Sequence, residues 1–304
     1  MQKMSPSKKR EALSFYLLIS PWLLVFFALG LLPLLWGLYL ACTNYTGFNF
    51  NQLHWVGLSN FSTVFHDDDA ISSLFRTIIL SIVIVPLSTA IGFLLAVLLN
   101  NKIKGLPFFR TVFYLPSVFP VIAAGLMWQV MYGRQDGVIN IILGYLGIHP
   151  INWMGYNLAQ TSLVLMMLWG SGGALMIYLA GLKNVPQSLY ESAAIDGAGS
   201  FQKFWKITIP LTTPVIFYNV IMGIIGSLQM FAQPMLLTPG ASWNTVPLQP
   251  IYLYVVNAWI QIFTNNRYSY GLALLWVLFI VVFILSLIVF FTSRYWVYYE
   301  SGEE

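Results

Sequence analysis

The amino-acid sequence predicts an all-α membrane protein with six transmembrane helices. Of the 304 residues, 58% are hydrophobic and only 8% are charged, whereas a soluble domain carries about 25% charged residues. So few charges cannot cover the surface of a soluble domain of this size, so lipid is the expected solvent for most of it. Six apolar stretches reach the roughly 20 residues that cross a hydrocarbon core. In lipid the backbone must satisfy its own hydrogen bonds, which favours helices.

The six expected spans follow one another along the chain. They lie at about residues 13–41 and 77–100, between Arg110 and Arg134, at about 158–182 and 209–237, and between Arg267 and Arg294. Residues 13–293 therefore form the expected membrane domain. A basic N-terminal tail (residues 1–12) and a C-terminal tail (residues 294–304) flank it.

A further apolar stretch, "TVPLQPIYLYVVNAWIQIF" (residues 245–263), is too polar for a span and has two prolines near its start. Proline breaks a helix interior, because it lacks the amide hydrogen and clashes with the preceding turn. We expect an interfacial helix on the outer surface. Its aromatic rings Tyr252, Tyr254 and Trp259 would then lie at the level of the lipid headgroups.

The basic residues indicate how the spans are oriented. With six spans, 11 of the 14 Lys and Arg residues fall on one side, and only Arg76, Arg134 and Arg267 fall on the other. Lys and Arg concentrate in cytoplasmic loops, so both termini are expected to be cytoplasmic. The run Asp67–Asp69 then lies outside, where we expect it to be solvated, as are Arg76 and Arg134.

No Asp, Glu, Lys, Arg or His lies deep in any of the six spans. Ion-coupled carriers keep such groups at membrane depth, and a membrane enzyme needs paired carboxylates or a placed nucleophile. The single cysteine, Cys42, excludes an intrachain disulfide, and the three histidines have no metal-ligand spacing. We therefore expect no enzymatic activity, no ion coupling, and no metal or cofactor in this chain. A passive channel stays open as an alternative, although nothing resembles a selectivity filter.

The loop between the fourth and fifth spans contains a polar, glycine-punctuated stretch, "YESAAIDGAG" (residues 190–199). Pro186 suits the first turn of a helix and Gly197 and Gly199 suit its end, so a helix of about two turns is expected. The next stretch, residues 200–209, has apolar residues at helical spacing and predicts an amphipathic helix on the inner membrane surface. Spacing alone favours a solvated connector over a docking element for a partner protein.

The same loop resembles the EAA loop of permease subunits of ATP-binding-cassette (ABC) importers. That pattern is Glu-Ala-Ala, three residues, Gly, nine residues, then Ile-x-Leu-Pro. Here the corresponding residues are Glu191-Ser192-Ala193, then Gly197, then Ile207-Thr208-Ile209-Pro210. Ser192 and Ile209 are mild departures. The phrases "WVGLSNF" (residues 55–61) and "GFLLAVLLNNKIKGLPFFRTVFYLPSVFP" (residues 92–120) are similar to the carbohydrate-importer subfamily.

This resemblance implies the type I ABC importer permease fold and a set of partners. These are a second, similar permease, two cytoplasmic ATPase subunits and an extracytoplasmic sugar-binding protein, within the plasma membrane lipid of a bacterium or archaeon and without nucleic acid. The loop at about residues 186–210 would couple to an ATPase cleft through Glu191, Ser192, Ala193, Asp196 and Gly197. ATP and magnesium would bind the ATPase, since no GxxxxGK[ST] phosphate loop is present here.

A sugar path should offer aromatic faces, amides and hydroxyls with little charge. Positions matched to the family, together with the polar residues of the fifth span, give nine expected path residues: Trp169, Gly170, Gly173, Asn219, Gly223, Ser227, Gln229, Met230 and Gln233. Gly and Ser also mark close helix packing, and "GSGG" (residues 170–173) is expected to pack. Trp128 and Trp296 are expected to be interfacial anchors, and Trp276 to pack against a helix or lipid.

The predicted function is therefore a permease subunit of an ATP-driven importer for a sugar, either a disaccharide or an oligosaccharide. Three alternatives are an ion-coupled carrier acting alone, a structural membrane subunit, and an ABC permease for another solute such as a glycerol phosphate. An ion-coupled carrier would lose uptake with the ion gradient and keep it without any ATPase. A structural subunit would tolerate changes at Ser227 or Gln229 without loss of uptake.

Overall fold

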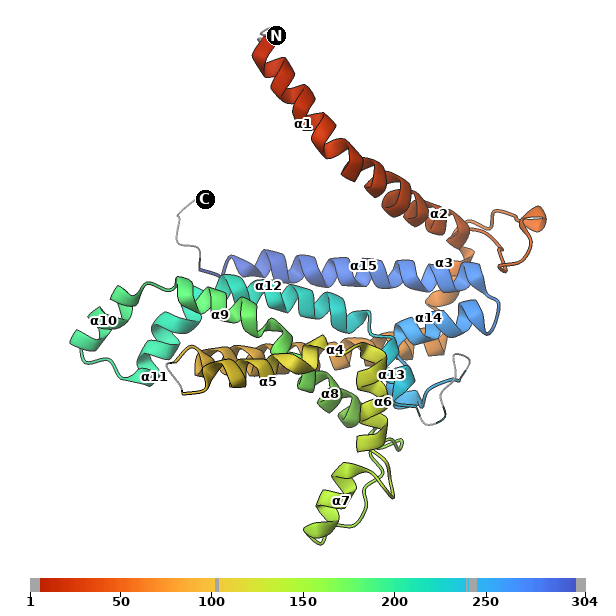
Figure 1. Ribbon diagram of the computed structural model, residues 1–304. Coiled ribbons are helices and arrows are strands. Elements are labelled where there is room, and N and C mark those ends of the chain that lie inside the picture. The colour runs from red at the N-terminus through yellow and green to blue at the C-terminus, as the bar shows by residue number, and fades with distance from the viewer. Residues whose placement is uncertain (1–5, 102–103, 239, 241–244, 299–304) are drawn as a thin grey trace.

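The computed structural model describes residues 6–101, 104–238, 240 and 245–298, and the regular secondary structure in these ranges is helical (Figure 1). Within them the only strand-like pairing is an isolated bridge between Thr43 and Trp55. Five helices are long and apolar enough to cross a membrane, and a bent pair can be counted as a sixth. The prediction of an all-α membrane protein is confirmed. The outer parts of both predicted tails, and Lys3 and Lys102, lie outside the described residues.

The first span is one continuous helix that stands away from the rest of the molecule (Figure 1). It consists of α1 (Pro6–Val25), a π-helical turn η1 (Phe26–Leu31) and α2 (Leu32–Ala41). Pro33 cannot donate to the carbonyl of the preceding turn, which accounts for the change of hydrogen-bond register beside it. None of the most apolar window of this helix is buried, and only its end at Leu40 and Ala41 joins the core.

Helix α4 (Asp68–Leu99) is the central helix of the bundle. Asp67 caps it by accepting hydrogen bonds from the backbone amides of Asp69, at 2.9 Å, and Ala70, at 3.3 Å. A side-chain oxygen at this position satisfies amides that have no partner within the helix. The second span therefore begins earlier than expected, and its buried face contacts the helices of the fourth and fifth spans.

The third span is bent rather than straight, a feature that the sequence analysis did not predict. It consists of α5 (Leu106–Val118) and α6 (Val121–Met131), which meet at an angle of 100°. Phe119 and Pro120 between them have extended backbone angles. A residue that precedes proline is driven out of the helical region by steric clash, and proline itself has no amide hydrogen to donate.

The fourth span also changes its winding halfway. Helix α8 (Ala159–Trp169) passes into a 3-10 segment, η3 (Gly170–Ala174), and then into α9 (Leu175–Asn184). Before it, α7 (Val138–Tyr145) stands apart from the bundle (Figure 1). The side chain of Asn140 holds α7 in place by accepting from the indole of Trp153, at 3.1 Å, and donating to the carbonyl of Ile151, at 2.8 Å.

The fifth span differs from its prediction at both ends. It starts at Ser200, because α11 (Ser200–Lys203), the π turn η4 (Phe204–Thr208) and α12 (Ile209–Leu228) form one continuous helix rather than a surface helix and a span. It stops at Leu228 rather than Leu237. Pro234 lacks the amide that would bond to the carbonyl of residue 230, and a short helix α13 (Ala232–Leu236) follows the break.

The stretch predicted as an interfacial helix is instead buried. It forms η5 (Gln249–Ile251) and α14 (Tyr254–Phe263), and α14 packs against α15 (Tyr268–Ser293), the sixth span, and against α4. Tyr252 is 8% exposed and Tyr254 is fully buried, so neither ring faces the surrounding lipid. Trp259 is half-buried and packs on Phe231, 5.0 Å between ring centres.

Two charges expected to be solvated have partners inside the fold. The guanidinium of Arg76 donates to the carbonyl of Tyr252 and to the hydroxyl of Ser72, both at 2.8 Å. Asp67 accepts from the hydroxyl of Tyr270 as well as capping α4. The sequence pattern could not reveal these partners, because Tyr252 is 176 positions from Arg76 and Tyr270 is 203 positions from Asp67.

Candidate functional site

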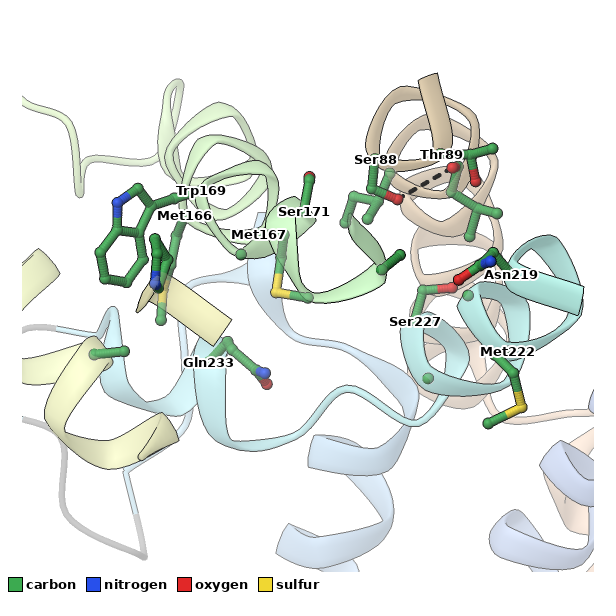
Figure 2. A pocket seen from close by; sticks show the side chains of 18 of the residues that line it. Ser88, Thr89, Met166, Met167, Trp169, Ser171, Asn219, Met222, Ser227 and Gln233 are labelled. Atoms are coloured by element: carbon green, nitrogen blue, oxygen red, sulfur yellow. Dashed lines mark hydrogen bonds between the residues drawn. The ribbon is translucent and has the colours of Figure 1, made fainter. Parts of the chain in front are cut away.

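A cavity of about 420 Å³ lies among α4, the bend between α5 and α6, the fourth span, and the end of α12 (Figure 2). It is lined by four residues of the bent third span, Pro116, Phe119, Val121 and Ala124, and by residues of every other element named. The irregular segments meet here, since the bend of the third span and the 3-10 segment η3 both border the space. Helices that break at membrane depth expose backbone, which is tolerated where it lines a cavity.

Six of the nine predicted path residues line this cavity: Trp169, Gly170, Asn219, Gly223, Ser227 and Gln233. Figure 2 shows Trp169 on the side of the fourth span, Asn219 and Ser227 on α12, and Gln233 from α13. Trp169 and Gln233, which lie far apart in the sequence, thus border the same cavity.

The other three predicted path residues lie elsewhere. Met230 is 3% exposed and belongs to an apolar core cluster. A Cβ on Gly173 would come within 3.1 Å of Ser117 on α5, so this glycine serves helix packing. Gln229 is exposed at the C-terminal end of α12, where the helix has already stopped.

The cavity is also lined by residues that the sequence analysis did not predict. Ser88 and Thr89 of α4 line it, as do Ser171 and Tyr178 of the fourth span, and three methionines complete it: Met166, Met167 and Met222. The pair Ser88 and Thr89 was a usable signal, because two consecutive hydroxyl residues within a span call for partners or a polar path. The methionines carried no such signal, since they also suit an ordinary core.

The aromatic part of the wall centres on Trp169. Its ring lies 5.9 Å from that of Phe119 and 6.0 Å from that of Trp128. Trp128 also lies 4.9 Å from Tyr132 and packs against a core cluster, so it is not the lipid-facing anchor that we expected. Trp296 packs on Phe217 at 5.9 Å.

The glycines of "GSGG" divide into two kinds. A Cβ on Gly172 would lie 1.8 Å from the carbonyl oxygen of Phe113, so α5 and η3 touch backbone to backbone. A Cβ on Gly170 would meet nothing within 4 Å. Gly172 therefore packs against a helix, as predicted for residues 170–173, whereas Gly170 borders open space.

Among the residues that the structure describes, no charged side chain lines the cavity. The polar groups around it are hydroxyls and amides, and Ser227 is bonded across the α4–α12 contact to the hydroxyl of Ser81 at 2.6 Å. Asn219 donates its amide to the carbonyl of Val215 at 2.8 Å. Neutral groups of this kind can hydrogen-bond hydroxyl-bearing ligands but offer no counter-charge to an ionic one.

The predicted coupling loop forms α10 (Gln187–Ile195) and projects from one end of the bundle (Figure 1). None of its residues is buried, and Ile195 is 88% exposed. The amide of Ala198 donates to the carbonyl of Ala193 at 2.8 Å, and the amide of Gly197 donates to that of Ala194 at 3.1 Å. This is a Schellman ending, which needs the left-handed φ of +79° at Gly197.

One side-chain contact ties α10 to the fifth span. The hydroxyls of Tyr190 and Thr208 lie 3.0 Å apart. Glu191, Ser192 and Asp196 are all exposed, and Ala193 is partly exposed. The five predicted coupling residues thus lie together on one short helix and its terminus.

Comparison with protein families gives a match over most of the chain. The family described as "binding-protein-dependent transport system inner membrane component" matches residues 88–298. This range begins at Ser88 in the cavity wall and includes α10 and α12.

Named relatives are similar over nearly their whole lengths. The chain is 37% identical to the probable ABC transporter permease protein YesP of Bacillus subtilis (strain 168), covering 99% of this chain and 97% of that protein. It is 33% identical to the trehalose/maltose transport system permease protein MalF of Thermococcus litoralis, covering 82% and 86%. It is 32% identical to the arabinooligosaccharides transport system permease protein AraP of Halalkalibacterium halodurans, covering 90% and 85%.

Among solved structures, the fold is similar to a chain of a bacterial ABC transporter involved in the import of the acidic polysaccharide alginate. The TM-score is 0.81 at 22% sequence identity, over 94% of this chain and 96% of that one. A second structure of the alginate transporter, in complex with a periplasmic protein bound to an alginate pentasaccharide, has the same TM-score at 20% identity and covers 96% and 98%. At these identities the likeness concerns the fold.

Proposed function

The chain belongs to the family of inner membrane components of binding-protein-dependent transport systems, and from this premise we propose that it is the permease subunit of an ATP-driven sugar importer. This membership confirms the resemblance drawn from the loop at Glu191. The proposed cargo is an uncharged disaccharide or oligosaccharide, and the relatives named for trehalose and maltose or for arabinooligosaccharides support that class.

The observation that carries the proposal is the uncharged, hydroxyl- and amide-lined cavity beside Trp169. Sugars present hydroxyls that both donate and accept hydrogen bonds, together with apolar faces that pack on aromatic rings. A glycerol phosphate carries a charge that no residue around this cavity would balance, so the wall favours a neutral solute.

Coupling to ATP is proposed to occur through α10. Its exposed apolar tip at Ile195, its exposed carboxylate at Glu191 and its glycine ending make a small, rigid projection that can enter a groove on another subunit. The proposed partners are two ATPase subunits at the α10 end, a second permease beside this chain, and a sugar-binding protein at the opposite end. ATP and magnesium would then be bound and ATP hydrolysed by the ATPase, not here.

The proposed orientation places the α10 end in the cytoplasm of a bacterium or archaeon. Lys183, Lys203 and Lys206 all lie on or beside α9 to α11, at this end. Basic residues accumulate on the cytoplasmic side of membrane proteins. Arg76, Arg134 and Arg267 would then face the exterior, where the binding protein delivers sugar.

Reconstitution of the complete transporter tests this proposal. Liposomes containing both permeases and the ATPase, supplied with binding protein outside and ATP inside, would be given labelled mono-, di- and oligosaccharides, including maltose, trehalose, lactose and arabinobiose. We expect uptake of at least one sugar that requires ATP and survives ionophores. Uptake that needs no ATPase and collapses with ionophores would instead establish an ion-coupled carrier.

A second comparison separates a path-lining permease from a structural subunit. Replacing Ser227 with alanine alters the cavity wall, and we expect ATP-dependent uptake to fall while the complex still assembles. Unchanged uptake in this variant would favour the structural role.

A further inference from the structure

A second pocket, of about 460 Å³, lies near the start of α4, at the end of the bundle away from α10 (Figure 1). We call it the outer pocket, because the proposed orientation places this end of the bundle outside the cell. Most of its lining is polar, unlike that of the central cavity. It is lined by Arg76 of α4, Tyr156 and Asn157 just before α8, Gln160 of α8, and Gln249 and Pro250 of η5.

The polar groups of the outer pocket are accessible to a ligand. Tyr156 is 57% exposed, and Asn157 and Gln249 are also exposed. The hydroxyl of Tyr156 donates to the side-chain oxygen of Gln249 at 3.0 Å, which leaves the N–H groups of the Gln249 amide available. Among the described residues, the side chain of Asn157 forms no hydrogen bond. A ligand can therefore bond to these groups without breaking contacts that hold the fold.

Arg76 is the only charged side chain that lines the outer pocket within the described ranges. Its bonds to the carbonyl of Tyr252 and the hydroxyl of Ser72 hold the half-buried guanidinium in the wall. Asp69 lies seven residues earlier, on the same face of α4, and its carboxylate attracts the guanidinium. This carboxylate offsets part of the positive potential of Arg76, so the pocket suits a neutral ligand better than an anion.

The outer pocket lies in line with the central cavity along two helices that pack together, α4 and α8. On α4, Arg76 borders the outer pocket and Ile84, eight residues later, borders the cavity. On α8, Gln160 and Met167, seven residues apart, do the same. With a rise of 1.5 Å per residue, these intervals correspond to about 10–12 Å. The two spaces therefore follow each other along one path.

Buried apolar side chains separate the outer pocket from the central cavity. Leu80 of α4 and Leu163 of α8 lie within the two intervals, and Ile251 ends η5. These three residues are 5%, 0% and 1% exposed, and they belong to one apolar cluster. A solute in the outer pocket thus stays outside the cavity until this cluster opens.

We propose that the outer pocket is an entry site, which binds the sugar after the binding protein releases it and before it reaches the central cavity. This inference rests on the proposed function. The planar fork of Arg76 donates to neighbouring sugar hydroxyls. The amides of Asn157, Gln160 and Gln249 both donate and accept, and the ring of Tyr156 offers an aromatic face to the sugar.

Variants at Asn157 test the entry site in the reconstituted transporter. Asn157→Ala removes an exposed amide that forms no bond within the described fold, and Asn157→Trp fills the pocket. The matched controls are Asn51→Ala and Asn51→Trp. Asn51 is exposed in the outer loop before α3, its side chain forms no hydrogen bond among the described residues, and it does not line the pocket.

Three quantities are compared with wild type for each variant. They are the unfolding temperature in detergent, the affinity of the binding protein for the transporter in nanodiscs, and the amount of labelled sugar taken up per ATP hydrolysed. The probe is the sugar of the panel above that wild type takes up fastest.

We expect Asn157→Ala to lower the uptake of sugar per ATP about three- to tenfold, the effect of one or two lost hydrogen bonds. Asn157→Trp should lower it further, because the indole occupies the space of the sugar. Neither variant should change the affinity of the binding protein or the unfolding temperature. The variants at Asn51 should keep wild-type values of all three quantities.

Other results overturn the inference in distinguishable ways. If both Asn157 variants keep wild-type uptake per ATP, the entry site is wrong and the proposed function stands. If the affinity of the binding protein falls in the Asn157 variants and not in the controls, the pocket is a docking surface for that protein and not a sugar site. A lower unfolding temperature in both Asn157 variants would assign this residue a structural role instead. If wild type takes up no sugar of the panel, the proposed function fails and the entry site fails with it.

Discussion

Two short helices, α10 and α14, both carry polar side chains, and they differ in how far the fold buries them. Helix α10 has no buried residue. Helix α14 has seven: Tyr254, Val256, Asn257, Ala258, Ile260, Gln261 and Ile262. Both contain polar side chains, although α14 is the more apolar of the two.

The polar groups of α14 are bonded within the chain. Asn257 is fully buried and accepts from the hydroxyl of Tyr252 at 2.9 Å, while its amide donates to the hydroxyl of Ser73 at 3.4 Å. The amide of Tyr254 donates to Thr77 on α4 at 2.9 Å. Buried polar networks of this kind stabilise one arrangement of the helices when every member is satisfied.

The polar groups of α10 are left available. Glu191 and Asp196 are exposed, and of its side chains only Tyr190 is linked to the rest of the bundle by a hydrogen bond between described residues. The comparison teaches that burial, rather than polarity, distinguishes a helix that stabilises the fold from one that is free to bind a partner. Mutations in α14 should therefore change stability, and mutations in α10 should change association.

The largest effect is expected for Asn257→Ala in α14. The change removes three buried hydrogen bonds and leaves the hydroxyl of Tyr252 unpaired, which should cost about 3 kcal/mol of unfolding free energy. Thermal unfolding in detergent measures it, with Thr264→Ala, at an exposed position just after α14, as the control. Equal unfolding temperatures for Asn257→Ala and wild type would contradict the buried network.

The next effect concerns the contact between α14 and α15. A Cβ on Gly271 would lie 2.2 Å from Ile262 and 3.1 Å from the carbonyl oxygen of Ala258. Gly271→Ala should therefore destabilise the protein by about 1–3 kcal/mol through overpacking. Gly199→Ala, beside α10, meets nothing within 4 Å and should leave the unfolding temperature unchanged. An unchanged unfolding temperature for Gly271→Ala would mean that α14 does not pack closely on α15.

A smaller and different effect is expected for Glu191→Ala in α10. This side chain is exposed, so the unfolding temperature should not change. The lost carboxylate should weaken association with the ATPase roughly tenfold, as for one charge-assisted hydrogen bond. Binding of purified ATPase to permease in nanodiscs measures this. Normal affinity for the variant would remove Glu191 from the coupling contact.

The smallest effect distinguishes the two glycines that follow α10. Gly197 has φ of +79° and Gly199 has φ of −71°, although both have open space around them. Gly197→Ala should strain the helix ending by about 1 kcal/mol and weaken ATPase binding severalfold, whereas Gly199→Ala should not. Equal binding by the two variants would show that the Schellman ending is not needed for docking.

Much of the fold could be predicted from the sequence, because apolar length and charge placement are local properties. The helix from Gln187 to Ile195 and its glycine ending were predictable for the same reason. The bend beside Pro120 and the break before Pro234 each depend on a single proline inside a long apolar stretch. A count of apolar residues does not reveal these interruptions. The burial of Tyr252 and Tyr254 depends on partners about 175 positions away, Arg76 and Thr77, which no local pattern contains.

The cavity was predictable in part for similar reasons. Asn219, Ser227 and Gln233 are polar residues in an apolar stretch, so their chemistry identified them. Ser171 and Tyr178 resembled packing residues, and their place in the cavity wall depends on the close contact of both with Gly92 of α4.

Photo-crosslinking from α10 and from α14 tests most directly the claim that α10 is the helix that docks on the ATPase. A benzophenone side chain would replace Ile195 at the tip of α10, or Thr264 at the exposed end of α14, in transporter complexes assembled with ATPase and binding protein. We predict an adduct with the ATPase from position 195 and none from position 264. An ATPase adduct from position 264, or its absence at position 195 in an assembled complex, would contradict the assignment of α10 as the docking helix.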